Sequence, residues 1–481
     1  MRFVHRYGVF CFAMLGGIVL RMLAMLGYRP ALWFVGDSYT YLAMTLRSAL
    51  RPERPGGYPL MLRALEPFHS FVVVVGLQHS LTLATAVMIY ALLRRSGLPD
   101  WGATLVVLPV LFDAYLIQLE HLLLSDTLFI FLVVSAFTAL LWHERPTAPL
   151  ATAAGVLLAL ATVTRTVGFA LLLLLPCWLI VRRAGWRALA VTALTAVLPL
   201  GAYAVSYHSR YHRYALSGAG GVFLWSRAMS FADCAKVHPP AGETALCPVP
   251  GLPRMRPETY VWNASSPINR LPTFRFTDSN NTLAQDFAER AILAQPGDYL
   301  STVAHSVART FRWSPTKDYG VALRYEFHPK EPAPPVEHSS TMDNARNDMA
   351  AYDHQPPQAP RVVEPYAGWI RGYQHHVYLP GPILGLMLLG GLAGIVAAWR
   401  SWGGPGLLPW AAAMVLLILP PATIDFDYRY VLPAIPLACL SLGIALARGV
   451  WAPAPRDETS GLSRAYGTNR LRRLPLTSRR S

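Results

Sequence analysis

The run YGVFCFAMLGGIVLRMLAMLG, residues 7–27, indicates the fold class of this chain. An α-helix needs about 20 apolar residues to cross the hydrocarbon core of a bilayer. Nine further apolar runs follow, at residues 72–93, 99–113, 121–142, 150–166, 168–182, 187–206, 380–398, 405–421 and 428–448. The pattern predicts an all-α polytopic membrane protein with about ten transmembrane helices. One large extracytoplasmic insertion of mixed structure is expected between the seventh and eighth runs.

The composition of the chain favours the same class. Of its 481 residues, 53% are hydrophobic and 14% are charged, whereas soluble domains carry about 25% charged residues. The formal net charge of +15 does not indicate nucleic-acid binding, because the arginines lie at the ends of apolar runs and in the C-terminal tail. Anionic lipid at the inner membrane face accounts for most of this charge.

The arginine distribution predicts the orientation. With both termini in the cytoplasm, the inner loops are basic, for example at Arg94, Arg145 and Arg400. The first run resembles a signal peptide but lacks a small-x-small cleavage site, so we expect it to be retained, with Arg21 snorkelling to the outer interface. The expected parts are an N-terminal transmembrane core (1–206), an extracytoplasmic domain (207–379), C-terminal transmembrane helices (380–450) and a disordered basic cytoplasmic tail (451–481).

The insertion has three features of its own. Residues 282–313 predict two amphipathic helices broken at Pro296-Gly297. Residues 329–365 are rich in Pro, His, Asn and Asp and are expected to be mobile, as a lid or a linker. Cys234 and Cys247 lie in a polar loop and are expected to form a disulfide if that loop faces an oxidising compartment.

The acidic side chains of interest lie at the predicted outer ends of the spans. Ionisable residues near a membrane core are costly, and each is therefore a functional hypothesis. They are Asp37, Asp113, Glu120, Asp126, Asp425 and Asp427.

Each acid also has a structural alternative. Asp37 or Ser38 is suited to capping the helix YTYLAMTL, and Ser125-Asp126 is suited to capping the fourth span. Asp425 and Asp427 are placed to pair with Arg429 at the interface. Glu120-His121 is suited to binding a metal or orienting a substrate.

Five arginines are candidate ligands for a phosphate group, since guanidinium groups make bidentate phosphate contacts. Arg47, Arg51 and Arg54 are spaced three and four residues apart, so a helix would place them on neighbouring faces. The others are Arg165 and Arg429. The alternative for Arg47, Arg51 and Arg54 is snorkelling to lipid headgroups. Between these groups, Gly56-Gly57-Tyr58-Pro59 is expected to shape the return of the first loop into the membrane.

Five segments together resemble the GT-C glycosyltransferase superfamily, in the bacterial branch related to protein O-mannosyltransferases and lipid A aminoarabinose transferases. None of them falls within 207–379. The segments are GDSYTY (36–41), RPGGYPLMLRAL (54–65), HLLLSDTLFIFLVVSAF (121–137), GVLLALATVTRTVGFALLLLLP (155–176) and RYVLPAIPLACL (429–440).

The resemblance implies an integral membrane glycosyltransferase that moves a sugar, with inversion, from a polyprenyl-phosphate donor to an extracytoplasmic acceptor. Asp37 matches the family's first-loop acid and would be the general base, and the arginines would stabilise the leaving phosphate. Many relatives have a second acid after this Asp, where this chain has Ser38. Glu120 or Asp126 is the expected replacement, and a divalent metal is left open.

Further residues are expected to bind substrate, and two other functions remain open. The substrate-binding candidates are Tyr39, Tyr58, His121 and Asp113. The sugar, whether mannose or another hexose or pentose, and the acceptor are not determined. A polyprenyl-lipid or sugar flippase would be favoured by repeated halves and broken midplane helices, which the sequence does not show. A non-catalytic envelope assembly protein would be favoured by a large apolar contact patch on 207–379.

Overall fold

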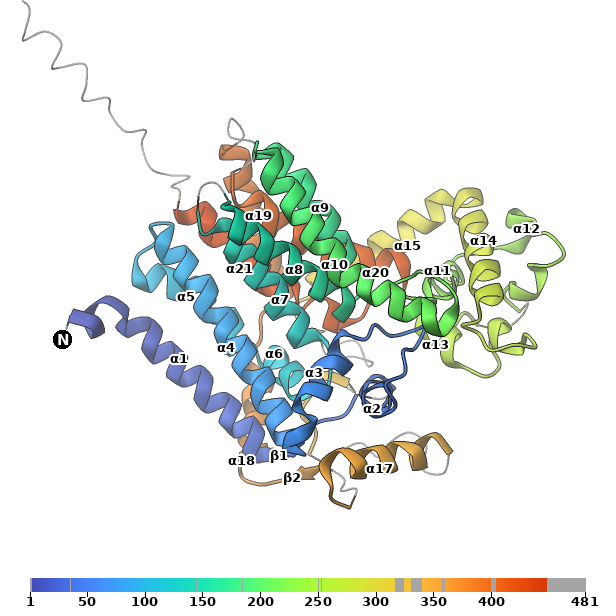
Figure 1. The fold of residues 1–481 in the computed structure, drawn as a ribbon, viewed down its shortest axis with the longest axis horizontal. Helices are drawn as coiled ribbons and strands as arrows, with labels where there is room; N and C mark the ends of the chain where they lie inside the picture. Colours follow the sequence, from blue (N-terminus) through green and yellow to red (C-terminus); the bar gives the residue numbers. More distant parts are fainter. Residues whose placement is uncertain are drawn as a thin grey trace, which may run out of the picture.

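The computed structural model describes residues 2–34, 36–143, 146–183, 185–249, 251, 253–315, 324–329, 340–356, 360–398 and 404–447. Arg145, Arg400 and the tail 451–481, which entered the predicted topology, lie outside these residues. The described chain is almost entirely helical (Figure 1).

All ten apolar runs form helices, because each offers a continuous apolar surface and internally satisfied backbone hydrogen bonds. They are α1 (Arg2–Gly27), α4 (Phe71–Arg95), α5 (Asp100–Phe112), α7 (Asp126–Leu141), α8 (Ala148–Thr164), α9 (Gly168–Val181), α10 (Trp186–Tyr211), α19 (Gly381–Ala397), α20 (Leu407–Thr423) and α21 (Ala434–Ala447). Among the described residues, four helices are long and apolar enough to cross a membrane, or up to six if each bent pair is one span. The chain is a membrane protein, and the number of its spans stays a prediction.

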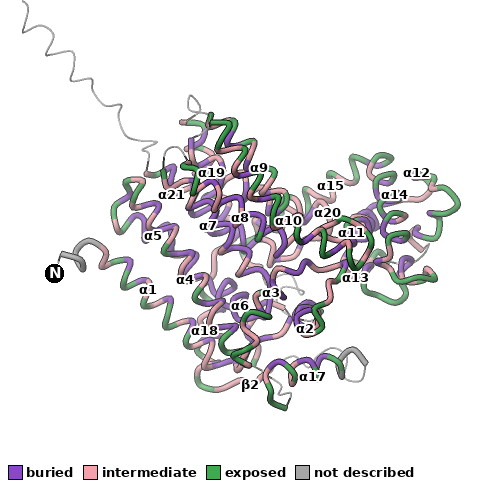
Figure 2. The backbone as a smooth tube through the Cα atoms, in the orientation of Figure 1, coloured by how far each residue is buried: buried purple, intermediate pink, exposed green. Residues whose placement is uncertain are grey.

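The bundle is held by a continuous apolar core. Helix α8 packs between α7 and α10, and α21 packs against α19 and α20. Figure 2 shows the buried chain concentrated in the middle of the bundle, around α7 and α8. Large apolar side chains on the outer helices are exposed instead, such as Phe12 at 80% and Leu198 at 68%. Exposed apolar faces of this extent fit contact with lipid.

Short elements connect the long helices at one end of the bundle. Helix α2 (Asp37–Arg47) and helix α3 (Gly57–Leu65) follow α1, with the turn η1 (Glu66–Phe68) before α4. Helix α6 (Ala114–His121) follows α5 at a bend of 49°. The turn η7 (Tyr428–Tyr430) precedes α21. Helix α2 and η7 carry three residues of the candidate site, Asp37, Arg429 and Tyr430.

The first part of the insertion is a helical subdomain with its own core, which includes the buried rings of Trp225 and Phe287 (Figure 1, right). Cys234 and Cys247 are joined by a disulfide. Helix α14 ends at Ala294 and α15 begins at Pro296, so the predicted helix break is confirmed. The elements are α11 (Gly220–Ala228), α12 (Cys234–Val237), η2 (Thr244–Leu246), α13 (Pro257–Trp262), η3 (Pro267–Arg270), α14 (Asp278–Ala294), α15 (Pro296–Ala308) and η4 (Arg309–Phe311).

The second part of the insertion returns to the bundle. Strand β2 (Arg361–Val362) pairs antiparallel with β1 (Tyr28–Arg29), and α18 (Tyr366–His376) packs on α1. The described part of the segment predicted to be mobile contains α17 (Ser340–Asp353), which packs on α2. Apart from this two-residue strand, the regular structure in the described residues of the insertion is helical, where a mixed structure was expected.

Candidate functional site

Asp37 is the first residue of α2, and its carboxylate is turned away from the helix. Gly36 precedes it with φ +85°, a backbone conformation that favours glycine. No side chain caps the N-terminus of α2. The Ser38 hydroxyl instead accepts a hydrogen bond from the Phe34 N–H at 2.8 Å and donates one to the Leu123 carbonyl at 2.9 Å. The capping alternative for Asp37 and Ser38 therefore does not hold, and Asp37 is free for another role.

Two arginines from distant parts of the chain hold the Asp37 carboxylate, which is only 3% exposed. Arg54 Nε donates to Oδ1 at 3.0 Å, and its Nη2 donates to the same oxygen. Arg429 Nη1 donates to Oδ2 at 2.6 Å. Burial alone raises the pKa of this carboxyl, but Arg54 and Arg429 more than offset it and hold the pKa below its ordinary value of 3.8. Asp37 is therefore ionised at neutral pH.

A second acid–arginine pair lies beside the first. Arg165 Nη1 donates to Asp126 Oδ1, while Asp126 Oδ2 is buried without a hydrogen-bond partner. The Tyr430 ring joins the two pairs, because its centroid is 5.3 Å from the Arg165 guanidinium and 5.2 Å from that of Arg429. We call Asp37, Arg54, Arg429, Asp126, Arg165 and Tyr430 the arginine cluster.

A glycine and a tyrosine residue fix the elements around this cluster. A Cβ on Gly57 would lie 2.7 Å from the Thr164 N and the Val163 O, so only glycine lets α3 approach the end of α8, just before Arg165. The Tyr41 hydroxyl lies 3.1 Å from the Ser125 hydroxyl, beside Asp126. Gly57 thus permits a close backbone approach, and the return of the first loop into the membrane stays a prediction.

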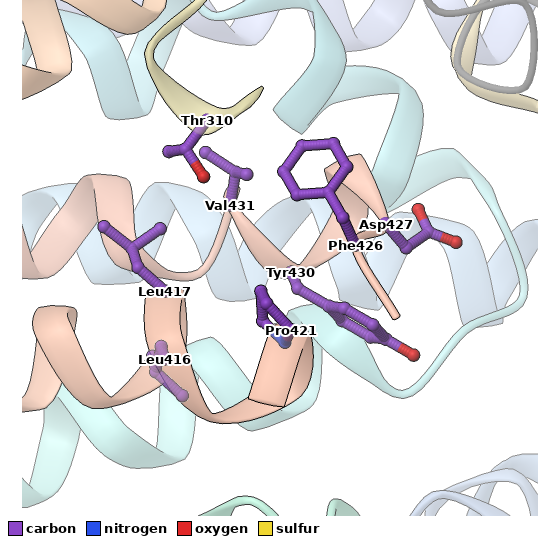
Figure 3. Close-up of a pocket in the computed structure, with 8 residues that line it drawn as sticks. All are labelled: Thr310, Leu416, Leu417, Pro421, Phe426, Asp427, Tyr430 and Val431. Carbon is purple, nitrogen blue, oxygen red and sulfur yellow. The ribbon is translucent and has the colours of Figure 1, made fainter. Parts of the chain in front are cut away.

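A small hollow adjoins the cluster between α20, η4 and η7 (Figure 3). Leu416 and Leu417 lie at one end, and the polar tips of Asp427 and Tyr430 lie at the other. Its lining is mostly apolar and consists of Thr310, Leu416, Leu417, Pro421, Phe426, Asp427, Tyr430 and Val431. An apolar surface therefore runs up to the guanidinium groups that flank Tyr430.

Glu120 and His121 belong to a separate set of buried groups, which we call the histidine network: Arg21, Glu120, His79 and His121. Arg21 Nε and Nη2 each donate to the Glu120 carboxylate at 2.8 Å. His79 Nδ1 lies 2.8 Å from Glu120 Oε2, and its Nε2 lies 3.1 Å from His121 Nδ1. The expectation that Arg21 snorkels to the interface is wrong, because its side chain is 2% exposed. Arg21 of α1, His79 of α4 and Glu120 of α6 thus tie three helices together.

The structure gives Asp113 and Tyr58 structural contacts as well. Asp113 caps α6 by accepting from the Leu116 N–H at 2.9 Å, and it also accepts from the Leu379 N–H at 2.7 Å. Tyr58 is fully buried and donates to Gln78 Oε1 at 2.6 Å. Both side chains are buried in these contacts, and their role in substrate binding stays a prediction.

Tyr39 stacks on Trp33 at 5.2 Å and is partly exposed. It lies two residues after Asp37 on α2 and keeps its predicted role in substrate binding.

The three arginines of the first loop do not share a helix, contrary to prediction, since α2 ends at Arg47. Arg47 pairs with Asp348 of α17 at 2.7 and 2.9 Å, and Arg51 is exposed. Only Arg54 reaches the cluster. The lesson is that spacing predicts a shared face only where the helix continues, and here Ser48 ends α2 with φ +48°.

The two acids before the last predicted span, Asp425 and Asp427, also contact different arginines. Asp427 accepts from the Arg429 backbone N–H at 3.2 Å and lies 3.7 Å from Arg324. Asp425 lies 3.9 Å from Arg227 in the helical subdomain. The predicted pairing with the Arg429 side chain is therefore made by Asp37 instead.

Sequence reasoning did not single out Tyr430 or Trp262. Tyr430 was detectable, since it follows Arg429 in the motif RYVLP. Trp262 lies in the insertion, with its ring centroid 5.9 Å from the Arg54 guanidinium, and no local signal indicated this position. Among the described residues, no group of three His, Cys, Asp or Glu side chains is arranged to hold a metal ion.

Part of the chain matches a known family model. Residues 64–208 match the family model described as dolichyl-phosphate-mannose-protein mannosyltransferase. A search of curated protein sequences finds no match.

Three solved structures are similar over larger parts of the chain. The S. cerevisiae protein O-mannosyltransferase Pmt1-Pmt2 complex bound to the sugar donor has TM-score 0.34 and 16% identity, over 46% of this chain and 36% of that chain. Archaeal oligosaccharyltransferase AglB from Archaeoglobus fulgidus has TM-score 0.40 and 13% identity, over 93% and 50%. ArnT from Cupriavidus metallidurans bound to undecaprenyl phosphate has TM-score 0.37 and 13% identity, over 92% and 78%.

This chain thus spans about a third of the yeast chain and half of the archaeal one. At these scores and identities, the proposals below rest on residues of this chain. The match over residues 64–208 confirms the predicted relationship of the chain to GT-C glycosyltransferases of the protein O-mannosyltransferase type.

Proposed function

We propose that this protein is a glycosyltransferase that moves a sugar from a polyprenyl-phosphate donor to a hydroxyl group of an extracytoplasmic acceptor, with inversion at the anomeric carbon. One observation carries the proposal. The buried carboxylate of Asp37 is shared by Arg54 and Arg429, beside the Arg165 guanidinium across Tyr430. A base and the groups that receive a leaving phosphate are thus side by side.

Asp37 is the proposed general base. An ionised carboxylate within hydrogen-bond reach of the acceptor hydroxyl takes its proton as that oxygen attacks the anomeric carbon. Arg54 and Arg429 occupy both carboxylate oxygens in the structure. The acceptor hydroxyl can bind Asp37 through the remaining lone pair of Oδ2, or after one guanidinium releases the carboxylate. The incoming donor phosphate is the natural competitor for that guanidinium, and the exchange would raise the basicity of Asp37.

Arg429 and Arg165 are the proposed ligands of the donor phosphate. Charge builds on this phosphate as the bond to the sugar breaks, and fixed guanidinium groups stabilise that charge. Asp126 holds Arg165 in place. Apolar side chains of α20 pack beside Tyr430, so the surroundings of the proposed phosphate ligands are apolar on that side (Figure 3).

The site is proposed to face the extracytoplasmic side, with both termini in the cytoplasm. The basic loops of the opposite end agree with the positive-inside rule. The disulfide between Cys234 and Cys247 lies in the insertion on the proposed outer side, where an oxidising compartment permits it.

Sugar transfer in membranes, measured with a panel of polyprenyl-phosphate sugars, tests the proposal. Wild type is expected to transfer from at least one donor, and Asp37→Asn to lose about 10²- to 10⁴-fold in rate. Asp348→Asn is the matched control, because it removes an Asp carboxylate that pairs with another first-loop arginine. Transfer by Asp37→Asn at the wild-type rate would remove Asp37 as the base. No transfer from any donor by wild type would reject the enzyme itself.

A further inference from the structure

The helical subdomain presents two large aromatic rings that are exposed but held in place. Trp262, at the end of α13, is 42% exposed, and Phe274 is 54% exposed. Both pack edge-on against the buried ring of Phe276, at 5.7 and 5.5 Å between centroids. Folding normally covers such rings, and exposed apolar groups held in a fixed orientation mark interaction sites. We call Trp262 and Phe274 the aromatic platform.

Polar groups surround the platform. The Arg275 guanidinium lies 5.0 Å from the Trp262 ring centroid and 5.5 Å from that of Phe274. It donates through Nη1 to Asn269 Oδ1, while its Nε is buried without a hydrogen-bond partner. Asn263 lies exposed beside Trp262. Flat apolar faces therefore alternate with amide and guanidinium groups.

The platform lies next to the proposed base. The Trp262 ring centroid is 5.9 Å from the guanidinium of Arg54, which itself donates two hydrogen bonds to Asp37. Figure 1 shows the loop after α2 running to the end of α10, next to α13. A ligand on the platform would therefore reach Asp37 by passing Arg54.

We propose that the aromatic platform binds a sugar ring of the acceptor, and that the acceptor is an oligosaccharide. This inference rests on the proposed glycosyltransferase function and names its acceptor class. The C–H face of a sugar ring is apolar and flat, so it covers the exposed rings, while its hydroxyl groups bond with Asn and Arg side chains at the rim. A charged guanidinium held beside the two rings fits such a ligand better than the acyl region of a membrane.

Binding to the full-length protein in detergent micelles tests the inference. The probes are an array of pyranosyl and furanosyl oligosaccharides, an array of Ser/Thr-containing peptides, and phosphatidylglycerol vesicles. Wild type is expected to bind some oligosaccharides, and Trp262→Ala and Phe274→Ala to weaken that binding about tenfold each. Trp262→Phe should keep most of it, because a ring remains. Trp369→Ala is the matched control, since Trp369 of α18 is 57% exposed and belongs to neither site.

Binding of polyprenyl phosphate is measured on the same preparations, which separates the two proposals. Because Phe274 belongs to the aromatic platform and not to the arginine cluster, Phe274→Ala is expected to bind the lipid as wild type does. If oligosaccharides bind wild type and the platform variants equally, or not at all, the platform has no sugar-binding role. Peptide or vesicle binding that is lost in these variants would assign the platform to that partner and overturn the inference. If the lipid does not bind and no sugar is transferred, the proposed function fails independently.

Discussion

The arginine cluster and the histidine network both bury acids against arginines, yet they differ in whether any polar atom lacks a hydrogen-bond partner. In the histidine network, Glu120 has both oxygens occupied by Arg21 and His79, and the chain of contacts closes on the Tyr28 carbonyl, 2.6 Å from His121 Nε2. Arg21 and Glu120 are 2% and 1% exposed. The network has no spare capacity for a ligand.

The arginine cluster has hydrogen-bonding atoms that are not used within the protein. Asp126 Oδ2 and Arg429 Nε are buried without hydrogen-bond partners. The side chains of Arg54, Arg165 and Arg429 are 17%, 14% and 12% exposed. A buried charge close to a membrane is a functional hypothesis by default. The comparison shows that the unused hydrogen-bonding capacity, and not burial alone, separates a candidate site from a structural tie.

The largest effect that tests this contrast is on folding. Glu120→Ala leaves Arg21 as an unpaired buried charge, and we expect a loss of about 3–5 kcal/mol of stability. The double variant Arg21→Met/Glu120→Gln removes both charges and keeps an acceptor for His79, so it should recover most of that loss. Thermal unfolding of the purified protein and sugar transfer by the folded fraction measure the two effects. A double variant that is folded yet inactive would show that the histidine network takes part in the reaction.

The next largest effect is expected on binding of the sugar donor. Arg165→Gln removes one proposed phosphate contact worth about 1.5–3 kcal/mol, which is roughly 10- to 150-fold in affinity. We expect KM for the polyprenyl-phosphate sugar and the Kd for polyprenyl phosphate to rise together. Arg94→Gln, at the predicted inner end of α4, is the control. A change in kcat alone, with lipid binding unaltered, would move Arg165 from phosphate binding to another step.

The pH dependence should be weak. Arg54 and Arg429 hold the pKa of Asp37 below 3.8, so the base stays ionised and its ion pairs stabilise the fold above that pH. This stability is lost only as pH falls below 3.8 towards the pKa in the folded state. We expect transfer by wild type to show no acid limb from Asp37 between about pH 5 and 8. An acid limb in that range that Asp37→Glu displaces would mean that neither arginine holds the carboxylate during turnover.

The smallest effect on transfer is expected from Arg47, which lies outside the arginine cluster. Arg47 is 46% exposed and pairs with Asp348, and half-exposed pairs of this kind contribute about 0–1 kcal/mol. Arg47→Ala should therefore change transfer by less than about threefold, compared with the large loss in Arg54→Ala. Equal losses in both variants would extend the site to α17 and restore the three-arginine phosphate site that the spacing predicted.

Much of the fold was predictable because its causes are local. Hydropathy over a single run is enough to make each apolar segment a helix, and Pro296 breaks the amphipathic helix where it stands because it lacks an N–H. The cysteine pair lies within one short loop. Helix α17 lies in the segment predicted to be mobile. It was not predictable, since it depends on contacts with α2.

The amino-acid sequence by itself indicated that carboxylates and arginines gather at one end of a helical membrane bundle, with Asp37 as the leading candidate for the base. Only the tertiary structure decided which of them meet. Asp37 and Arg429 are 392 positions apart, and Arg21 and Glu120 are 99 apart. Each partner is selected by how far a helix is rotated and where it ends, which is set by packing against neighbouring helices and not by the residues beside the charge. Glu120 and Asp126 therefore look alike in sequence, although one closes a structural network and the other leaves an oxygen open beside Arg165.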